Sequence, residues 1–230
     1  MTASPVPVLT IDGPSGSGKG TISRRVAQRL GWELLDSGAL YRLVAVGARR
    51  AGLDEEDVAA HAALAGAMAV RFAVRPNGAE QILLDGEDVT AEVRGETAGG
   101  GASRVAAWGP VRGALLQRQR DFARAPGLVA DGRDMGTVVF PDARLKIFLT
   151  ASADERALRR YNQLKDKGSG VSLAALSREI AERDERDMRR ALAPLKAADD
   201  AIVVDSTSLD IDEVVERVMR LAQERGLAAR

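Results

Sequence analysis

The stretch Gly13-Pro14-Ser15-Gly16-Ser17-Gly18-Lys19-Gly20-Thr21 decides how the rest of this sequence is interpreted. It follows an apolar run from Val6 to Ile11, which predicts a short buried strand. It precedes residues 22–30, where apolar side chains recur at helical spacing. A strand, a glycine-rich loop and a helix therefore follow one another, and the glycines predict a sharp turn of the backbone at the start of the helix.

This order of elements is that of a P-loop, the phosphate-binding turn of many nucleotide-binding proteins. Gly13, Gly16 and Gly18 allow successive backbone N–H groups to converge on phosphate oxygens at the positive end of the helix. Lys19 is the only lysine before Lys146 in an arginine-rich chain, so this position favours a compact ammonium against the β- and γ-phosphates. A glycine after the lysine gives the G-K-G-T variant, which is typical of nucleotide kinases. The alternative is a chance glycine-rich turn without a ligand. The predicted ATP-binding residues of the loop are Gly13, Pro14, Ser15, Gly16, Ser17, Gly18, Lys19, Gly20 and Thr21.

The composition limits the classes of protein and partner. The 230 residues suit one α/β domain with an insertion. Because 33 basic residues balance 33 acidic ones, no charge excess indicates a nucleic-acid polymer or an anionic membrane as partner. The chain has no cysteine, no recognisable signal peptide and no apolar run near the roughly 20 residues that span a bilayer. We therefore expect a cytoplasmic protein that binds small molecules.

The single histidine, His61, lies in residues 54–68, which predict an alanine-rich helix. One imidazole without cysteine or a second histidine makes a poor metal site. We expect it to be a surface or half-buried helix residue without a role in the chemistry.

The pattern of strands and helices predicts one core with an insertion. Residues 1–68 and 95–230 alternate strands and helices, and further core strands are expected at residues 33–35, 128–131, 145–149 and 201–204. Residues 69–94 differ, because two alternating runs flank the turn signal Pro76-Asn77-Gly78 and predict a small antiparallel β insertion. Gly99-Gly100-Gly101 predicts a break before a helix that begins near Ser103.

Polar side chains follow the predicted core strands, at the sheet edge where ligands bind in open α/β folds. Asp131 ends an apolar run and is a candidate magnesium ligand, together with the Thr21 hydroxyl. Arg133 and Asp134 follow directly; they either face a ligand or form a buried ion pair with each other. Arg42, on the helix after the second strand, either faces a ligand or is a solvated charge.

Two later segments carry charges at helical spacing. Arg156, Arg159 and Arg160 share one face of a helix that Ser152 is expected to cap. With the polar loop that follows, this segment predicts a lid over residues 155–172 with phosphate-binding arginines, or else an exposed helix with a flexible tip. Farther on, one helical stripe either faces a ligand or forms solvent-exposed ion pairs. The stripe consists of Arg183, Asp187 and Arg190.

Three segments together resemble bacterial cytidylate kinases: residues 12–21, residues 35–42 (LDSGALYR) and residues 130–143 (ADGRDMGTVVFPDA). The resemblance implies a P-loop kinase with a five-stranded parallel sheet flanked by helices, a small antiparallel β insertion and a short helical lid. It implies transfer of the γ-phosphate of ATP to CMP or dCMP with Mg²⁺. It also implies that the β insertion closes over the monophosphate and that residues 155–172 close over ATP.

The resemblance also implies roles for individual residues. Arg42, Arg133 and Arg190 would hold the CMP phosphate, Arg183 and Asp187 would reach the ribose, and Tyr41 would pack by the base. Ser103, Arg112 and Asp134 would read the cytosine edge, and Ser37 is a further nucleotide contact. The residues expected to act in the transfer itself are Lys19, Arg133, Arg160 and Arg190, with Arg156 and Arg159 binding ATP.

Two other functions fit parts of the sequence. A P-loop kinase could act on another small acceptor, such as a different nucleotide or a metabolite hydroxyl. A hydroxyl acceptor would need a carboxylate base, and Asp36 or Asp131 could serve. A nucleotide-binding switch or regulatory ATPase would bind ATP without transferring phosphate to a small molecule, but the predicted insertion and lid favour a kinase that excludes water. A phosphate acceptor is already anionic and needs no base, which suits a chain with no obvious one. We expect a monomer, because no long exposed apolar stripe remains.

Overall fold

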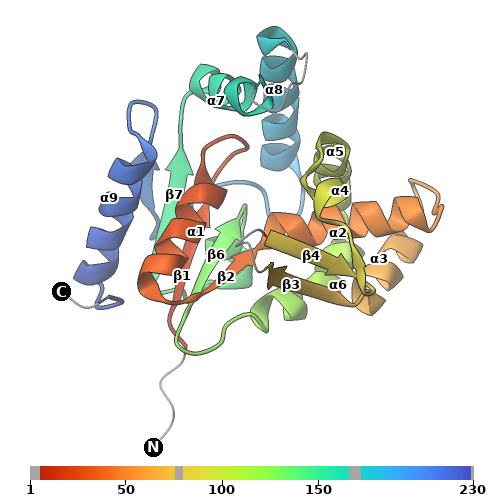
Figure 1. The fold of residues 1–230 in the computed structure, drawn as a ribbon, viewed down its shortest axis with the longest axis horizontal. Helices are drawn as coiled ribbons and strands as arrows, with labels where there is room; N and C mark the ends of the chain where they lie inside the picture. Colours follow the sequence, from red (N-terminus) through yellow and green to blue (C-terminus); the bar gives the residue numbers. More distant parts are fainter. Residues whose placement is uncertain (1–5, 76–79, 166–171, 229–230) are drawn as a thin grey trace, which may run out of the picture. The chain divides into compact units, whose positions relative to one another are not determined.

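The structure is a computed structural model that describes residues 6–75, 80–165 and 172–228. The chain forms two compact units (Figure 1). The first comprises residues 1–36 and 119–230, and the second comprises residues 37–118.

The first unit is built on the five-stranded parallel sheet that the sequence analysis expects. Its strand order is β2-β6-β1-β7-β8. The strands are β1 (Val8–Asp12), β2 (Glu33–Asp36), β6 (Leu128–Gly132), β7 (Leu145–Thr150) and β8 (Ile202–Asp205). Because all strands run parallel, their carboxyl ends share one edge: Asp12 lies opposite Gly132, and Asp36 lies opposite Asp131.

Helices pack against this sheet and against each other. They are α1 (Lys19–Leu30), α7 (Ala153–Lys165), α8 (Leu173–Arg189) and α9 (Ile211–Glu224), with a short π-helix η1 (Met135–Val139) after β6. Helices α1 and α9 lie side by side, as do α7 and α8 (Figure 1). Val26 and Val218 are fully buried in the core against the sheet, and Ser152 and Ser172 cap α7 and α8 through their hydroxyls. The predicted lid, residues 155–172, comprises α7 from its third residue onward and ends at Ser172, the N-cap of α8. Its residues 166–171 lie outside the described part of the chain.

The second unit contains helices and the predicted β insertion. Its helices are α2 (Ser37–Arg50), α3 (Val58–Ala67), α4 (Thr90–Arg94) and α5 (Glu96–Val105), and α6 (Gly109–Arg120) begins in it. The strands β3 (Val70–Val74) and β4 (Glu80–Leu84) pair antiparallel, and β5 (Glu87–Asp88) adds a third strand. The turn signal at residues 76–78 falls outside the described residues.

The three consecutive glycines lie inside α5, so the predicted break at this point is wrong. A Cβ at Gly101 would lie 2.8 Å from the Cβ of Ala45 on α2, whereas a Cβ at Gly100 would meet no atom within 4 Å. Gly101 therefore allows α5 to pack closely on α2, and this packing outweighs the weak helix propensity of glycine.

His61 is buried, with 4 % of its surface exposed, which corrects the expectation of a surface or half-buried residue. Its ring meets the Trp108 ring edge-on, at a centroid distance of 5.1 Å and an angle of 76°. The helix that carries it is shorter than predicted, since Asp57 caps α3 by accepting a hydrogen bond from the N–H of Ala60. The histidine is thus a core residue of the second unit.

Within residues 6–75, 80–165 and 172–228, no helix combines the length and the apolar composition needed to cross a membrane.

Candidate active site

The glycine-rich loop joins β1 to α1 and makes the sharp turn that its glycines predict. Gly16 and Gly18 have φ angles of 76° and 88°, in the left-handed region that favours glycine. Gly13 is required for a different reason, because a Cβ there would lie 2.0 Å from the carbonyl oxygen of Leu149 on β7. Gly18 is the N-cap of α1 and has no side chain to accept from its first N–H groups. The N–H of Thr21 donates to the carbonyl oxygen of Gly18, so the N–H groups of Lys19 and Gly20 are the ones that would meet an anion.

Lys19 begins α1 and is almost fully buried. Its Nζ donates to the carbonyl oxygen of Pro14 at 2.9 Å. Burial lowers the pKa of Lys19 to about 7, and repulsion from Arg133 and Arg183 adds to this effect, while Asp131 opposes it. Several cationic groups thus converge near the loop, and an anion bound there would relieve their repulsion.

Two carboxylates lie on neighbouring strands at the same sheet edge. Asp131 ends β6 and Asp36 ends β2, directly opposite it. Burial raises the pKa of Asp131 to about 7, although the Lys19 ammonium lowers it. The Oδ2 atom of Asp131 would lie 3.3 Å from a Cβ at Gly20, so this carboxylate lies against the start of α1.

Asp12 is the last residue of β1 and also ends at this edge. Its Oδ1 accepts from the N–H of Met135 and its Oδ2 from the N–H of Gly136, both at 2.8 Å. Burial raises the pKa of Asp12 to about 6, against the lowering effect of these two hydrogen bonds.

The arginines that follow β6 and α8 pair with carboxylates that are distant in the sequence. Arg133 donates from Nε to Asp187 Oδ2 at 2.9 Å, and Nη2 of Arg190 lies 3.7 Å from Oδ1 of Asp134. Arg190 also donates to the carbonyl oxygen of Ala193. The alternative of an ion pair between Arg133 and Asp134 is therefore wrong.

The predicted stripe on α8 faces the interior of the first unit. Burial raises the pKa of Asp187, but Arg133, Arg183 and Arg190 together hold it below its ordinary value. Asp187 and the side chain of Arg190 are both buried, so the solvent-exposed alternative for this stripe is also wrong.

The first arginine of the predicted lid, Arg156, is buried and points toward the glycine-rich loop. It donates to the carbonyl oxygen of Ser15 at 3.0 Å and to that of Ala151 at 3.0 Å. It also pairs with Asp184 on α8. Arg156 therefore connects α7, α8 and the loop.

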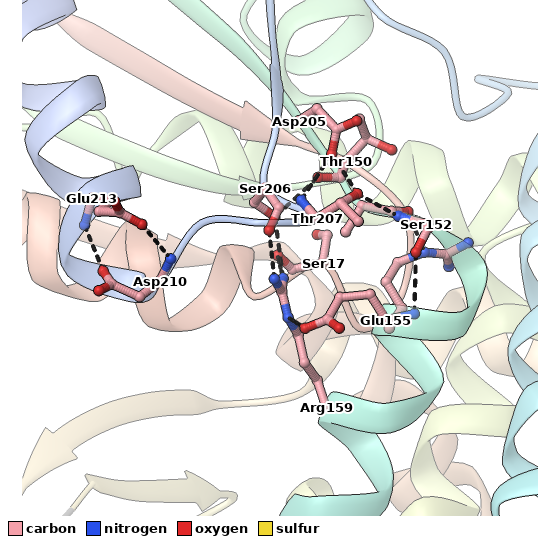
Figure 2. A network of polar contacts seen from close by, with 12 residues as sticks. Ser17, Thr150, Ser152, Glu155, Arg159, Asp205, Ser206, Thr207, Asp210 and Glu213 are labelled. Carbon is pink, nitrogen blue, oxygen red and sulfur yellow. Dashed lines mark hydrogen bonds and ion pairs between the residues drawn. The ribbon is translucent and has the colours of Figure 1, made fainter.

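Arg159, one turn later, connects the same loop to the segment after β8 (Figure 2). It donates from Nε to Glu155 at 2.8 Å, from Nη1 to the Ser206 hydroxyl at 3.1 Å and to the carbonyl oxygen of Ser17 at 3.4 Å. The Ser206 hydroxyl donates in turn to the carbonyl oxygen of Thr150. Arg160 is half-buried and donates to the side-chain oxygen of Gln163 at 3.2 Å.

In the second unit the structure brings together two residues expected to lie near a base. The guanidinium carbon of Arg112 lies 5.8 Å from the centre of the Tyr41 ring, and Arg112 donates to the carbonyl oxygen of Ala106 at 3.3 Å. Tyr41 is buried, as are Ser37 and Ser103.

Arg42, in the same unit, is not a solvated charge, because its guanidinium bonds to the backbone. Its Nη1 donates to the carbonyl oxygens of Val93 at 3.0 Å and Gly95 at 2.9 Å, so it holds the junction of α4 and α5.

A family model described as cytidylate kinase matches residues 9–224 of this chain. The chain belongs to the cytidylate kinase family. Curated relatives named cytidylate kinase agree: that of Stutzerimonas stutzeri (strain A1501) is 61 % identical over 225 residues, covering 97 % of this chain and 98 % of the relative. That of Azotobacter vinelandii is 58 % identical over 229 residues, covering 99 % and 100 %.

A crystal structure of TT1252 from Thermus thermophilus matches with a TM-score of 0.50 at 17 % identity, covering 96 % of this chain and 98 % of that chain. This likeness supports the fold alone.

Two charged residues of this chain make site contacts that the sequence analysis did not assign. Asp12 had a recognisable signal, because an acidic residue ends an apolar strand directly before the glycine-rich loop. Asp184 had none, since its partner Arg156 lies 28 residues earlier on another helix and many charges surround it in the sequence.

Proposed function

We propose that this member of the cytidylate kinase family transfers the γ-phosphate of ATP to CMP or dCMP, giving ADP and CDP or dCDP. The observation that carries the proposal is the convergence of cations at the glycine-rich loop, where the charges of Arg133 and Arg183 help to lower the pKa of the buried Lys19. A site for two phosphate groups has to offset their mutual repulsion, and guanidinium groups with backbone N–H donors do so.

The arginines would serve transfer by being held in place before the substrates bind. Arg133 is fixed by Asp187, and Arg190 is fixed by Asp134 and the backbone. Fixed cations stabilise developing charge without reorganising during the reaction. The acceptor phosphate is itself a nucleophile, so no general base is needed, and Arg133, Arg190 and Arg160 with Lys19 would act on the phosphates in transfer.

A magnesium ion would fit at the start of α1. Thr21 is exposed there, and the Asp131 carboxylate lies against Gly20 on the same turn. These are oxygen donors, which Mg²⁺ prefers, and few protein ligands suffice where phosphates supply the others. Thr21 and, directly or through water, Asp131 would hold the ion, which neutralises charge on the transferred phosphoryl group when bound.

The three arginines of α7 would act on ATP in two ways. Arg156 and Arg159 donate to the carbonyl oxygens of Ser15 and Ser17, so they would support ATP binding by bracing the loop. Arg160 lies on the same helix one residue on and would reach the phosphates when the lid of residues 155–172 closes.

Residues of the second unit would contribute contacts to the acceptor nucleotide. Tyr41 with Arg112 would pack by the base, and Arg112 and Ser103 would donate to the cytosine acceptors while Asp134 accepts from its amino group. Uracil presents a carbonyl in place of that amino group, so UMP should be a poor substrate.

Ser37 and Arg42 would contact the same acceptor nucleotide, and residues 69–94 would close over its phosphate, with residues 1–68 and 95–230 as the core. The monomeric state and the cytoplasmic location stay predictions.

The test is ADP release from MgATP with CMP, dCMP, UMP, AMP and GMP offered separately, with Lys19→Ala as the blank. We expect turnover with CMP and dCMP and little with the other three. Turnover with none of them, in a protein that binds ATP, would contradict the acceptor assignment.

A further inference from the structure

Asp12 stands between the two loops that carry the proposed substrate contacts. Its backbone continues directly into Gly13, the first residue of the glycine-rich loop. Its side chain, of a residue only 5 % exposed, holds Met135 and Gly136 through both carboxylate oxygens. These two residues follow Arg133 and Asp134, so one residue ties the ATP loop to the segment 132–136.

The two hydrogen bonds to Asp12 give the first N–H groups of the π-helix η1 the acceptors that the helix itself does not provide. The first N–H groups of a helix have no partner within it, and a carboxylate is favoured at that end. The carbonyl oxygen of Asp134 accepts from the N–H groups of Val138 and Val139, whereas the N–H groups of Met135 and Gly136 bond to Asp12. Replacing a carboxylate oxygen by an amide nitrogen would leave one buried donor without an acceptor.

The opposite side of the segment is equally constrained. A Cβ at Gly136 would lie 2.9 Å from the Thr10 hydroxyl and 3.1 Å from the Lys146 side chain, and that lysine is fixed by Asp200 at 2.8 Å. Gly136 therefore allows the backbone to reach β1 and β7 closely enough for Asp12 to bond to it. Asp12 and Gly136 together therefore fix the position of segment 132–136 on the sheet.

We propose that Asp12 is a positioning residue for phosphoryl transfer, which sets the place of Arg133 and Asp134 relative to the glycine-rich loop. The inference rests on the proposed function, in which Arg133 holds the acceptor phosphate and Asp134 reads the base. Transfer requires the two phosphates to be in line, and a displacement of about 1 Å lowers rates on the order of 100-fold. Asp12 acts through these residues and touches neither substrate.

Two variants disturb the position of segment 132–136 independently. Asp12→Asn removes one hydrogen-bond acceptor, and Gly136→Ala adds a methyl group for which Thr10 and Lys146 leave no room. For each we expect kcat/KM for CMP to fall by about 100-fold and the preference for CMP over UMP to fall about tenfold, because Arg133 and Asp134 are both displaced. ATP affinity, measured without acceptor, should stay within about threefold, since the loop glycines and Lys19 remain.

The matched control is Val218→Ala, which opens a cavity in the core on α9, the helix that packs against α1 and β7. It should lower the midpoint of unfolding but leave the CMP-to-UMP preference unchanged. A folded Asp12→Asn or Gly136→Ala enzyme with an unchanged preference and KM for CMP would overturn the proposal. Equal losses of ATP and CMP affinity would also overturn it.

The wild-type enzyme separates this inference from the proposed function. Absence of CMP phosphorylation by the wild type would refute the function. Hydrogen exchange at the N–H groups of Met135 and Gly136 tests their hydrogen bonds to Asp12 without turnover. Faster exchange in Asp12→Asn is expected, and unaltered protection would overturn the proposal that Asp12 holds this segment.

Discussion

Arg133 takes its partner from α8, 54 residues farther along the chain, and not from the adjacent Asp134. The pair is largely buried, so each charge depends on the other to offset its lost hydration. The guanidinium is held by Asp187 at Nε and by the carbonyl oxygen of Gly132 at Nη1, and we expect its Nη2 group to donate to a phosphate. At this scale the site consists of charges whose positions are set before any substrate arrives.

Replacing Arg133 by alanine should lower turnover at least about tenfold, because removing one such donor costs on the order of 2–4 kcal/mol of transition-state stabilisation. Steady-state rates at saturating CMP and MgATP measure the effect, with circular dichroism to check the fold. Turnover close to that of the wild type would remove Arg133 from the proposed transfer machinery.

The ion pairs of Asp187 predict how the free energy of unfolding depends on pH. Its pKa in the folded protein lies below the ordinary value of 3.8, because its three arginines outweigh burial. As the pH falls, the unfolded chain therefore takes up the proton first, so the stabilisation is complete above pH 3.8 and is lost below it. Asp187→Asn should lower the free energy of unfolding at pH 7, and the difference from wild type should shrink toward pH 3, as urea unfolding would measure. A difference that is constant over this range would contradict the ion-pair account.

At the scale of elements, α5 shows how packing can outweigh propensity. Gly100 and Gly101 are neighbours in this helix, but only Gly101 faces α2. Alanine generally stabilises a helix relative to glycine by about 0.5–1 kcal/mol. The two positions should therefore respond to the same substitution with opposite sign.

Gly100→Ala should raise the free energy of unfolding by about 0.5–1 kcal/mol, whereas Gly101→Ala should lower it by about 1–3 kcal/mol. Urea unfolding of both variants provides the measurement, and each is the control for the other. Equal effects of the two substitutions would show that the close contact with Ala45 is not what requires a glycine.

The same elements show how far sequence reasoning reaches. The five core strands, the glycine-rich turn and the paired strands β3 and β4 follow from local periodicity and glycine spacing, and the structure contains them. The glycines of α5 misled because one of them, Gly101, is required by a contact with Ala45, more than fifty residues earlier. The π-helix η1 was not expected either, since Asp12 anchors it from 123 residues away. Local patterns carry no information on such partners.

The charged site shows the same division. The residues of the sheet edge could be named from their positions after strands, but not their pairing. The sequence suggested only the adjacent Asp134 as an ion-pair partner of Arg133, whereas the tertiary structure pairs Arg133 with Asp187.

At the scale of the whole molecule, the residues proposed for ATP lie in the first unit, and Ser37, Tyr41, Arg42, Ser103 and Arg112 lie in the second. The two ligands should therefore slow hydrogen exchange in different units. MgATP alone should slow hydrogen exchange in residues 13–21, and adding CMP should slow it further in α2 and α5, as mass spectrometry would detect. With CMP replaced by GMP, α2 and α5 should show no added protection. Protection of the second unit by MgATP alone would argue against the assignment of the acceptor to it.

The central claim is that the γ-phosphate passes to CMP and not to water. A ³¹P NMR time course of wild-type enzyme with MgATP and CMP tests it most directly, because it resolves CDP, ADP and inorganic phosphate in one sample. We predict that CDP and ADP appear in equal amounts, without inorganic phosphate, and that ATP persists when CMP is omitted. Formation of ADP and inorganic phosphate at the same rate with and without CMP would contradict the account.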